Sequence, residues 1–239
     1  MAPGVDRDRW LFTCEHGGRE VPAEFAPLFA DAGKVLASHR GSDPGSLEVF
    51  NALAPHFADA GFKSTTTRLL VDLNRSLHHP GLFSEFTRTL PAAERAAIVD
   101  RWWRPWREAV AATVAAWQST GLAVRHVSVH SFTPRLRGQA RNADIGLLYD
   151  PGRPAERAFC RAWQARLLAL GWRVRLNYPY RGVADGHTTA LRRRFTQDYC
   201  GIELELNQAL FPRRRDALCT DLVASLASLR RNNHPAGGG

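Results

Sequence analysis

Hydrophobic positions along the chain follow two periods, and segments with one period alternate with segments that have the other. Short runs of continuous or alternating apolar residues predict strands, each followed by a loop, within residues 10–18, 62–75, 123–131, 172–180 and 199–208. Hydrophobic residues at helical spacing predict helices within residues 43–61, 90–117, 154–171 and 215–231. Strands that alternate with helices are typical of a layered α/β fold.

Glycine and proline mark breaks in this pattern. Gly61 follows a helical pattern and is expected to cap its C-terminus. Pro105 stands inside another and predicts a kink or a division into two helices. Because neither an internal repeat nor a linker interrupts the sequence, we expect one domain over residues 1–232 and a flexible tail at 233–239.

Composition is that of an ordinary globular protein, with 44% hydrophobic and 23% charged residues among 239. No apolar stretch reaches the roughly 20 residues that a membrane span requires. The first residues lack the apolar core of a signal peptide, so we expect a cytoplasmic protein without a membrane partner. Four scattered cysteines predict reduced thiols rather than disulfides or a thiolate metal site.

The net charge of +9 changes this picture little. Only Lys34 and Lys63 are lysines among 32 basic residues, and such a bias is as typical of GC-rich codon usage as of function. A nucleic-acid-binding protein gathers its charge on one face or helix. The densest arginine clusters here, at 192–194, 213–215 and 230–231, are short and dispersed, so we expect no nucleic-acid partner.

Polar side chains that carry chemistry follow several predicted strands. Ligands of α/β proteins bind beyond the carboxyl ends of the strands, so these residues are expected to meet there. A catalytic zinc ion takes three ligands from histidine and carboxylate side chains, and a nearby carboxylate can accept a proton from water. The residues are His16, Asp72, Asn74, Arg75, His130, Glu203 and Glu205.

Structural explanations stay open for the same residues. His130 can be a core histidine that a backbone carbonyl satisfies, and Asp72 can cap a turn. Arg75 can pair with a helix terminus. Glu203 can lie in solvent at a sheet edge, although alternation along 199–208 places Glu203 and Glu205 on one face.

Six segments occur in an order and spacing that resembles the N-formylglutamate amidohydrolase family, over roughly residues 9–212. That family is in turn similar to the zinc carboxypeptidases, and the resemblance implies a three-layer α/β/α domain with a mixed, mostly parallel sheet. The segments are "CEHGGREVP", "RLLVDLNR", "VSVHSFTPRLRG", "RNADIGLLYDP", "NYPYRG" and "GIELELNQ".

The resemblance implies roles for residues in these segments. His16 and His130 would bind a zinc ion, and Glu205 would be the general base that later protonates the leaving amine. The other implied roles are substrate binding by Arg68, Asn74 and Arg75, with the arginines holding a carboxylate, and a contact of Arg141 with a second carboxylate or the developing oxyanion.

The third zinc ligand departs from the carboxypeptidase pattern. Those enzymes place a glutamate three residues after the first histidine, but position 19 here is arginine and Glu20 comes one residue late. Members of the amidohydrolase family often show a histidine, aspartate and glycine segment, which this chain has as His39, Asp43 and Gly45. Asp43 is therefore the preferred third ligand, and Glu20 stays the alternative.

The resemblance implies a zinc-dependent hydrolase of N-acyl amino acids, with N-formyl-L-glutamate, cleaved to formate and glutamate, as the expected substrate. A carboxypeptidase or a peptidoglycan amidase with the same zinc centre is the alternative enzyme. A non-catalytic relative that binds an acidic ligand through its arginines is the alternative of another class. The sequence leaves the oligomeric state open.

Overall fold

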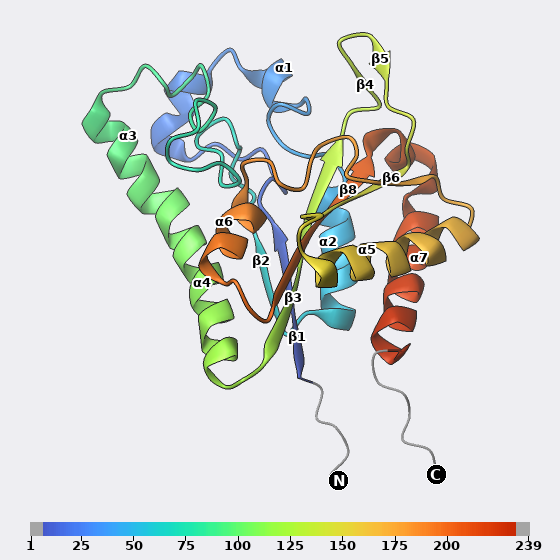
Figure 1. Ribbon diagram of the computed structural model, residues 1–239. Coiled ribbons are helices and arrows are strands. Elements are labelled where there is room, and N and C mark those ends of the chain that lie inside the picture. Colours follow the sequence, from blue (N-terminus) through green and yellow to red (C-terminus); the bar gives the residue numbers. More distant parts are fainter. Residues whose placement is uncertain (1–6, 233–239) are drawn as a thin grey trace, which may run out of the picture.

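A computed structural model of the chain describes residues 7–232 and has a central sheet between two layers of helices (Figure 1). Six strands form the sheet in the order β2–β1–β3–β8–β6–β7, and every neighbouring pair is parallel except β6 and β8. This arrangement confirms the predicted α/β fold with a mixed, mostly parallel sheet. The strands are β1 (Asp8–Cys14), β2 (Ala60–Lys63), β3 (Ala123–Phe132), β6 (Ile145–Leu148), β7 (Val174–Leu176) and β8 (Tyr199–Asn207).

Helices cover both faces of the sheet (Figure 1). One face packs against α2 (Ser46–Phe57), α5 (Pro154–Ala169) and α7 (Phe211–Asn232). The other packs against α4 (Arg104–Ser119) and α6 (His187–Arg194). The remaining elements are η1 (Ala23–Phe29), α1 (Gly33–Leu36), α3 (Ala92–Ile98), the π-helical turn η2 (Val99–Trp103), η3 (Gln208–Leu210), and the hairpin of β4 (Arg135–Leu136) and β5 (Gln139–Ala140).

The two faces of the central strands differ in polarity. On β3, Val127 and Val129 pack into the large core beneath α2, α5 and α7. The alternate positions of β3 point to the α4 and α6 side and carry His126, Ser128 and His130, all buried. Because side chains alternate along a strand, this sequence sends a row of polar groups to one face of the sheet. The candidate site is built on that face.

The second predicted strand is mostly wrong. Only residues 60–63 pair in the sheet, as β2, so Gly61 lies in a strand and not at a helix end. The preceding helix already ends at Phe57. Residues 64–75 form turns instead, with backbone bonds such as Leu70 N to Thr67 O. Their apolar residues are buried against α3 and η2 rather than beside another strand, which explains the strand-like composition.

Other differences concern short elements. The predicted strand at 172–180 shortens to β7, and neither β6 nor α6 was predicted. The backbone stays helical from residue 92 to residue 119, and Pro105 falls in the first turn of α4, directly after the π-helical turn η2. The irregularity predicted at Pro105 is therefore this turn, and the helix does not divide in two. The expected tail at 233–239 lies outside the described residues, and the domain limits stay a prediction.

Two further expectations concern cysteines and membrane spans. Cys14, Cys160, Cys200 and Cys219 are all free thiols, and the first three are buried. Within residues 7–232, no helix has the length and the apolar character that crossing a bilayer requires.

Candidate active site

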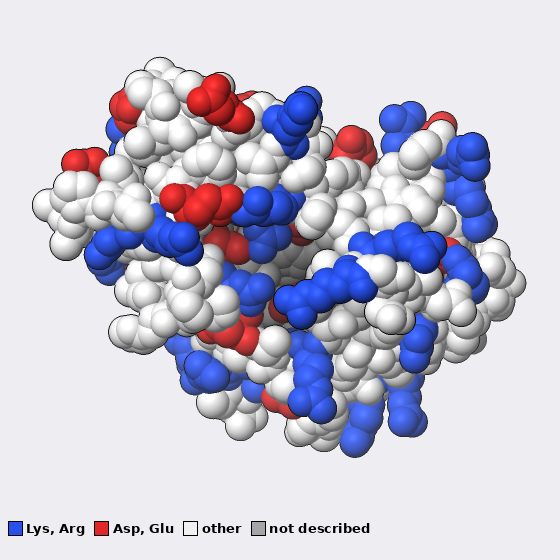
Figure 2. All heavy atoms as spheres, turned by 90° about the horizontal axis from the view of Figure 1, so that it is seen from above, with Lys and Arg blue, Asp and Glu red and all other residues white. Residues whose placement is uncertain are grey.

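A cavity of about 200 Å³ opens beyond the carboxyl ends of β1 and β3, where the surface in Figure 2 is hollowed between basic side chains. It brings together nearly all of the residues that the sequence singled out. Those in its wall are His16, His39, Asp43, Arg68, Asn74, Arg75, His130, Glu203 and Glu205. The wall also includes Tyr180, Arg181 and Gln208, which the sequence reasoning did not assign.

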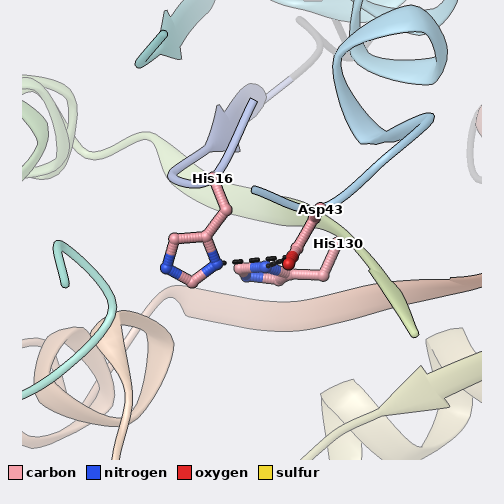
Figure 3. Close-up of side chains that lie close together, drawn as sticks. All are labelled: His16, Asp43 and His130. Atoms are coloured by element: carbon pink, nitrogen blue, oxygen red, sulfur yellow. Dashed lines mark hydrogen bonds and ion pairs between the residues drawn. The ribbon is translucent and has the colours of Figure 1, made fainter. Parts of the chain in front are cut away.

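Three side chains converge at the base of this cavity (Figure 3). His16 follows β1, Asp43 lies in the loop before α2, and His130 lies near the end of β3. Oδ2 of Asp43 is 3.3 Å from Nδ1 of His16 and 3.0 Å from Nδ1 of His130. One donor atom from each residue lies within 4.8 Å of the other two, and all three residues are buried.

Local backbone geometry places His16 and Asp43 side by side. Asp43 N donates to the carbonyl oxygen of His16 at 2.9 Å. Gly18 passes so close to the next strand connection that a Cβ there would lie 2.2 Å from Thr65 O. Gly45 has φ of +87° at the start of α2, a conformation that favours glycine. The glycines of both motifs are therefore needed for the approach of the two loops.

Arg68 and Asp72 hold the outer side of the cluster. Nε2 of His16 lies 2.7 Å from Oδ1 of Asp72, so the carboxylate accepts from this nitrogen and leaves Nδ1 facing Asp43. Arg68 donates to Oδ1 of Asp43 at 3.1 Å and to Oδ2 of Asp72 at 2.6 Å. This bridge occupies one oxygen of Asp43 and leaves Oδ2 for the imidazoles.

The electrostatics of the cluster fit a bound cation. Burial alone would lower the pKa of His130, but the hydrogen bond to Asp43 and the charges of Glu15 and Glu205 raise it to about 10. Burial raises the pKa of Asp43, yet His16, His130 and Arg68 outweigh it and hold the pKa well below its usual range. The carboxylates thus create an environment that favours positive charge at the position where three donor atoms meet.

The donor set itself matches zinc. Two imidazole nitrogens and one carboxylate oxygen are the ligands of many catalytic zinc sites, whereas Mg²⁺ and Ca²⁺ prefer oxygen. Oε2 of Glu205 is also buried and has no hydrogen-bond partner in the described part of the chain. An orphaned carboxylate oxygen beside such a cluster is what a water or substrate group would satisfy. The residues present therefore fit a metal ion with an open position.

Glu203 and Glu205 share one face of β8, as the alternation predicts, and both line the cavity. Their surroundings differ. The hydroxyl of Thr188 on α6 donates to Oε1 of Glu203. Glu205 is more deeply buried, and burial, with Asp43 and Glu203 adding to it and His130 opposing it, raises its pKa to about 8. Glu205 is consequently a carboxyl group that can exchange a proton near neutral pH.

The predicted arginines have different surroundings. Arg75 lines the cavity, and its Nη1 donates to Asp185 O at 2.8 Å. Arg141 stands outside the wall, with its guanidinium over the ring of Tyr180 at 5.0 Å. Arg181 lines the cavity without a hydrogen bond or ion pair to any described side chain. The structure thus leaves Arg75 and Arg181 more open to a ligand than Arg68 or Arg141.

Glu20 lies apart from this cluster. Its side chain is exposed and accepts a hydrogen bond from the Thr65 hydroxyl at 2.6 Å. It does not line the cavity. Between the two candidates for a third ligand, the structure brings only Asp43 to His16 and His130.

A second polar cluster, which the sequence reasoning missed, lies directly behind His130. Glu15, Ser128 and His187 are buried there within hydrogen-bond distance of one another or of His130. Alternation in "HVSVHS" places Ser128 on the face of His130 and was a usable signal. His187 comes from the unpredicted α6, and no local pattern relates it to Glu15.

Solved structures with the same fold include two of similar length. The gene product Atu2144 from Agrobacterium tumefaciens has a TM-score of 0.76 and 27% identity, over 92% of this chain and 91% of that one. The N-formylglutamate amidohydrolase from Ralstonia eutropha JMP134 has a TM-score of 0.69 and 21% identity, over 93% of each chain. A metallo-carboxypeptidase from Pseudomonas aeruginosa has a TM-score of 0.41 and 15% identity, over 96% of this chain and 58% of that one.

Sequence comparison covers the same region. No curated protein matches the chain in sequence. The model of one family, N-formylglutamate amidohydrolase, matches residues 8–211, which include every residue of the cavity wall. The chain belongs to the N-formylglutamate amidohydrolase family.

Proposed function

We propose that this protein is a zinc-dependent amidohydrolase that cleaves N-formyl-L-glutamate to formate and glutamate. The observation that carries the proposal is the convergence of His16, Asp43 and His130 beside the unpartnered carboxyl of Glu205. Membership of the family supports the reaction class. The donor set supports zinc over harder cations.

Zinc bound by His16, Asp43 and His130 would polarise the acyl oxygen and lower the pKa of the attacking water. Glu205 takes the proton from that water as general base and delivers it to the amine nitrogen when the amide bond breaks. Burial suits Glu205 to this work because it raises the pKa of the carboxyl toward neutrality. Asp72 and Arg68 keep His16 and Asp43 oriented throughout.

The substrate is selected by charge and size. A cavity of about 200 Å³ suits a small amino-acid derivative better than a peptidoglycan strand or a protein C-terminus. Arg75 and Asn74 hold the α-carboxylate, and Arg181 meets the side-chain carboxylate, for which a guanidinium is the fitting partner. The guanidinium of Arg68 is bonded to the carboxylates of Asp43 and Asp72, so it orients Asp43 and does not bind the substrate directly.

Arg141 keeps a lesser role in this scheme. Its guanidinium packs on the rings of Phe132 and Tyr180, which form part of the cavity wall. We assign it to shaping that wall and not to contact with the oxyanion. The cytoplasmic location stays a prediction from the sequence.

The proposal is tested by measuring formate release from a matched set of substrates. N-formyl-L-glutamate should be hydrolysed with a kcat/KM at least about 10² above N-formyl-L-leucine, because the uncharged side chain leaves a cavity arginine without its partner. A metal chelator should abolish turnover and added zinc should restore it. Equal rates for both substrates would contradict the carboxylate selection, and turnover that survives chelation would contradict the metal requirement.

A further inference from the structure

The side of His130 that faces away from Asp43 points into a buried polar layer. Ser128 Oγ lies 2.9 Å from Nε2 of His130, and Oε2 of Glu15 lies 2.8 Å from that hydroxyl. The amide nitrogen of Asn74 is farther from Nε2, at 3.5 Å. Both Glu15 and Ser128 are 1% exposed, so bulk water does not compete for these contacts.

The direction of these hydrogen bonds follows from the number of protons. An ionised carboxylate only accepts, and a hydroxyl has a single proton to donate. Ser128 spends that proton on Glu15, so its oxygen is left to accept from His130. Nε2 of His130 must then carry a proton. Nδ1 is the nitrogen that remains for a metal ion, and it is the one that faces Oδ2 of Asp43.

Glu15 is itself held on its other oxygen. Nδ1 of His187 lies 3.1 Å from Oε1, and the indole nitrogen of Trp106 lies 3.2 Å from the same ring nitrogen. The indole N–H of Trp106 donates to this ring nitrogen, and Ser128 donates to Oε2, so both oxygens of Glu15 are held within the buried layer. Nε2 of His187 is buried without a hydrogen-bond partner in the described part of the chain.

His16 has the simpler form of the same arrangement. Asp72 contacts Nε2 of His16 directly at 2.7 Å and so leaves Nδ1 toward Asp43. His130 has no carboxylate as close to its Nε2, since Oε2 of Glu15 lies 3.6 Å away. The Ser128 hydroxyl fills that gap.

We propose that Glu15 is a positioning residue of the metal centre, which acts through Ser128 to keep the proton of His130 on Nε2 and to present Nδ1 to the ion. The inference rests on the proposed function, because it takes His130 to be a metal ligand. Glu15 contacts neither substrate nor metal in this scheme. Its effect is on the orientation and proton position of one ligand.

Zinc affinity, measured by competition with a chelator and without substrate, tests the inference. Ser128→Ala and Glu15→Gln should each weaken zinc binding about 10- to 100-fold, as losses behind metal ligands do. The double variant should have about the same zinc affinity as the single variant with the lower affinity. Both changes interrupt the same chain of hydrogen bonds from Glu15 through Ser128 to His130, so their effects should not add. Parental affinity in both single variants would overturn the inference.

Thr13→Val is the matched control. Thr13 is the register partner of Ser128 on the neighbouring strand β1, is equally buried, and has its hydroxyl 2.9 Å from Nε2 of His126 instead of His130. It should keep the parental zinc affinity. If Thr13→Val loses as much zinc affinity as Ser128→Ala, the effect comes from disturbed packing in the buried layer. That result would overturn the role assigned to Ser128 and Glu15.

A second measurement uses the parental protein and does not depend on a variant that folds. In zinc-loaded protein with nitrogen-15 histidine, the spectrum should show His130 with its proton on Nε2, protected from exchange. A proton on Nδ1 would overturn the inference while the hydrolase proposal stands. If the parental protein binds no zinc, both fail together.

Discussion

Glu205 is the register partner of His130 in the parallel pairing of β8 with β3. Neighbouring strands thereby place a carboxyl group and an imidazole on one face at the same height of the sheet, where the cavity opens. Ser128 and Glu203 form the pair two positions earlier. The relative positions of the proposed base, Glu205, and the proposed metal ligand, His130, are thus set by the sheet rather than by a flexible loop, which suits a site that must hold reacting groups in place.

Glu205→Gln should fold and retain zinc, because the amide is nearly the same size, but lose turnover. The expected loss in kcat is about 10² to 10⁴, the range that general acid and base catalysis supplies. Steady-state formate release gives the rate, and metal analysis gives the zinc content. Glu203→Gln is the control and should stay substantially active, since Thr188 already occupies its carboxylate. If Glu203→Gln is inactive and Glu205→Gln is active, Glu203 and not Glu205 is the general base.

Arg181→Met should raise KM for N-formyl-L-glutamate about 10-fold or more, because it removes the partner of one substrate carboxylate. Its effect on N-formyl-L-leucine should be small, since that substrate has only the α-carboxylate. Arg75→Met should impair both substrates. Arg141→Met, in the second layer of the wall, should change KM less than either; a larger effect there would return Arg141 to the substrate contacts.

Asp43→Ala should weaken zinc binding by about 10-fold or more, because it removes one of the three proposed ligands and one of the two carboxylates that pair with Arg68. Glu20→Ala should leave the affinity unchanged. Chelator competition measures both. A loss in Glu20→Ala with none in Asp43→Ala would show that the binding loop of the folded enzyme differs from the arrangement described above.

Asp144 provides a pH-dependent contribution to stability outside the site. Burial raises its pKa, but the side chain and backbone of Arg173 outweigh this and lower it. A lowered pKa in the folded state adds stability above the unfolded pKa of about 3.9, and that stability is lost as pH falls through the folded pKa. Asp144→Asn should therefore cost roughly 1–2 kcal/mol at pH 7, and the cost should shrink in acid.

Urea unfolding at neutral and acid pH measures the difference between parent and variant. Asp216→Asn is the control, since Asp216 pairs with Arg215 on the exposed surface. It should show no measurable change at either pH. A cost for Asp144→Asn that stays constant into acid would assign the effect to packing instead of charge.

How far the sequence predicts the fold depends on the length and burial of each element. β1, β3 and β8 were predicted because each is long and largely buried. Their sequences therefore show apolar residues either in a continuous run or at every second position. β6 has only four residues, too few for a period to show, and it was not predicted. It pairs with β8, a contact that no local pattern records. β7 was predicted within 172–180 but has only three residues.

The unpredicted α6 has a different cause. Its sequence "HTTALRRR" is largely polar, yet Arg192 is buried there because its guanidinium meets Glu156 from α5. A pattern of apolar residues cannot reveal an inward face that is built from an ion pair. His187 and Thr188, which contact Glu15 and Glu203, entered the site with this helix.

The site residues likewise divide into those that a local sequence pattern predicts and those that depend on contacts distant in the sequence. His16, His130 and Glu205 were predicted because they sit on, or directly after, well-defined strands, so their meeting point follows from sheet geometry. Arg68 was assigned to substrate because sequence shows its charge but not its partners. Its two carboxylates, Asp43 and Asp72, come from a different loop and from a turn that was predicted as strand. Because Arg68 pairs with both carboxylates, we propose that it supports Asp43 and not the substrate.

The most direct test of the metal-dependent site is the zinc content of the protein as purified, compared with that of His16→Ala and His130→Ala. The arrangement predicts about one zinc ion per chain in the parent, because two imidazoles and one carboxylate complete the protein share of a catalytic zinc site. Each variant should lose most of that zinc while staying folded by circular dichroism. Full zinc occupancy in both variants, or none in an active parent, would contradict it.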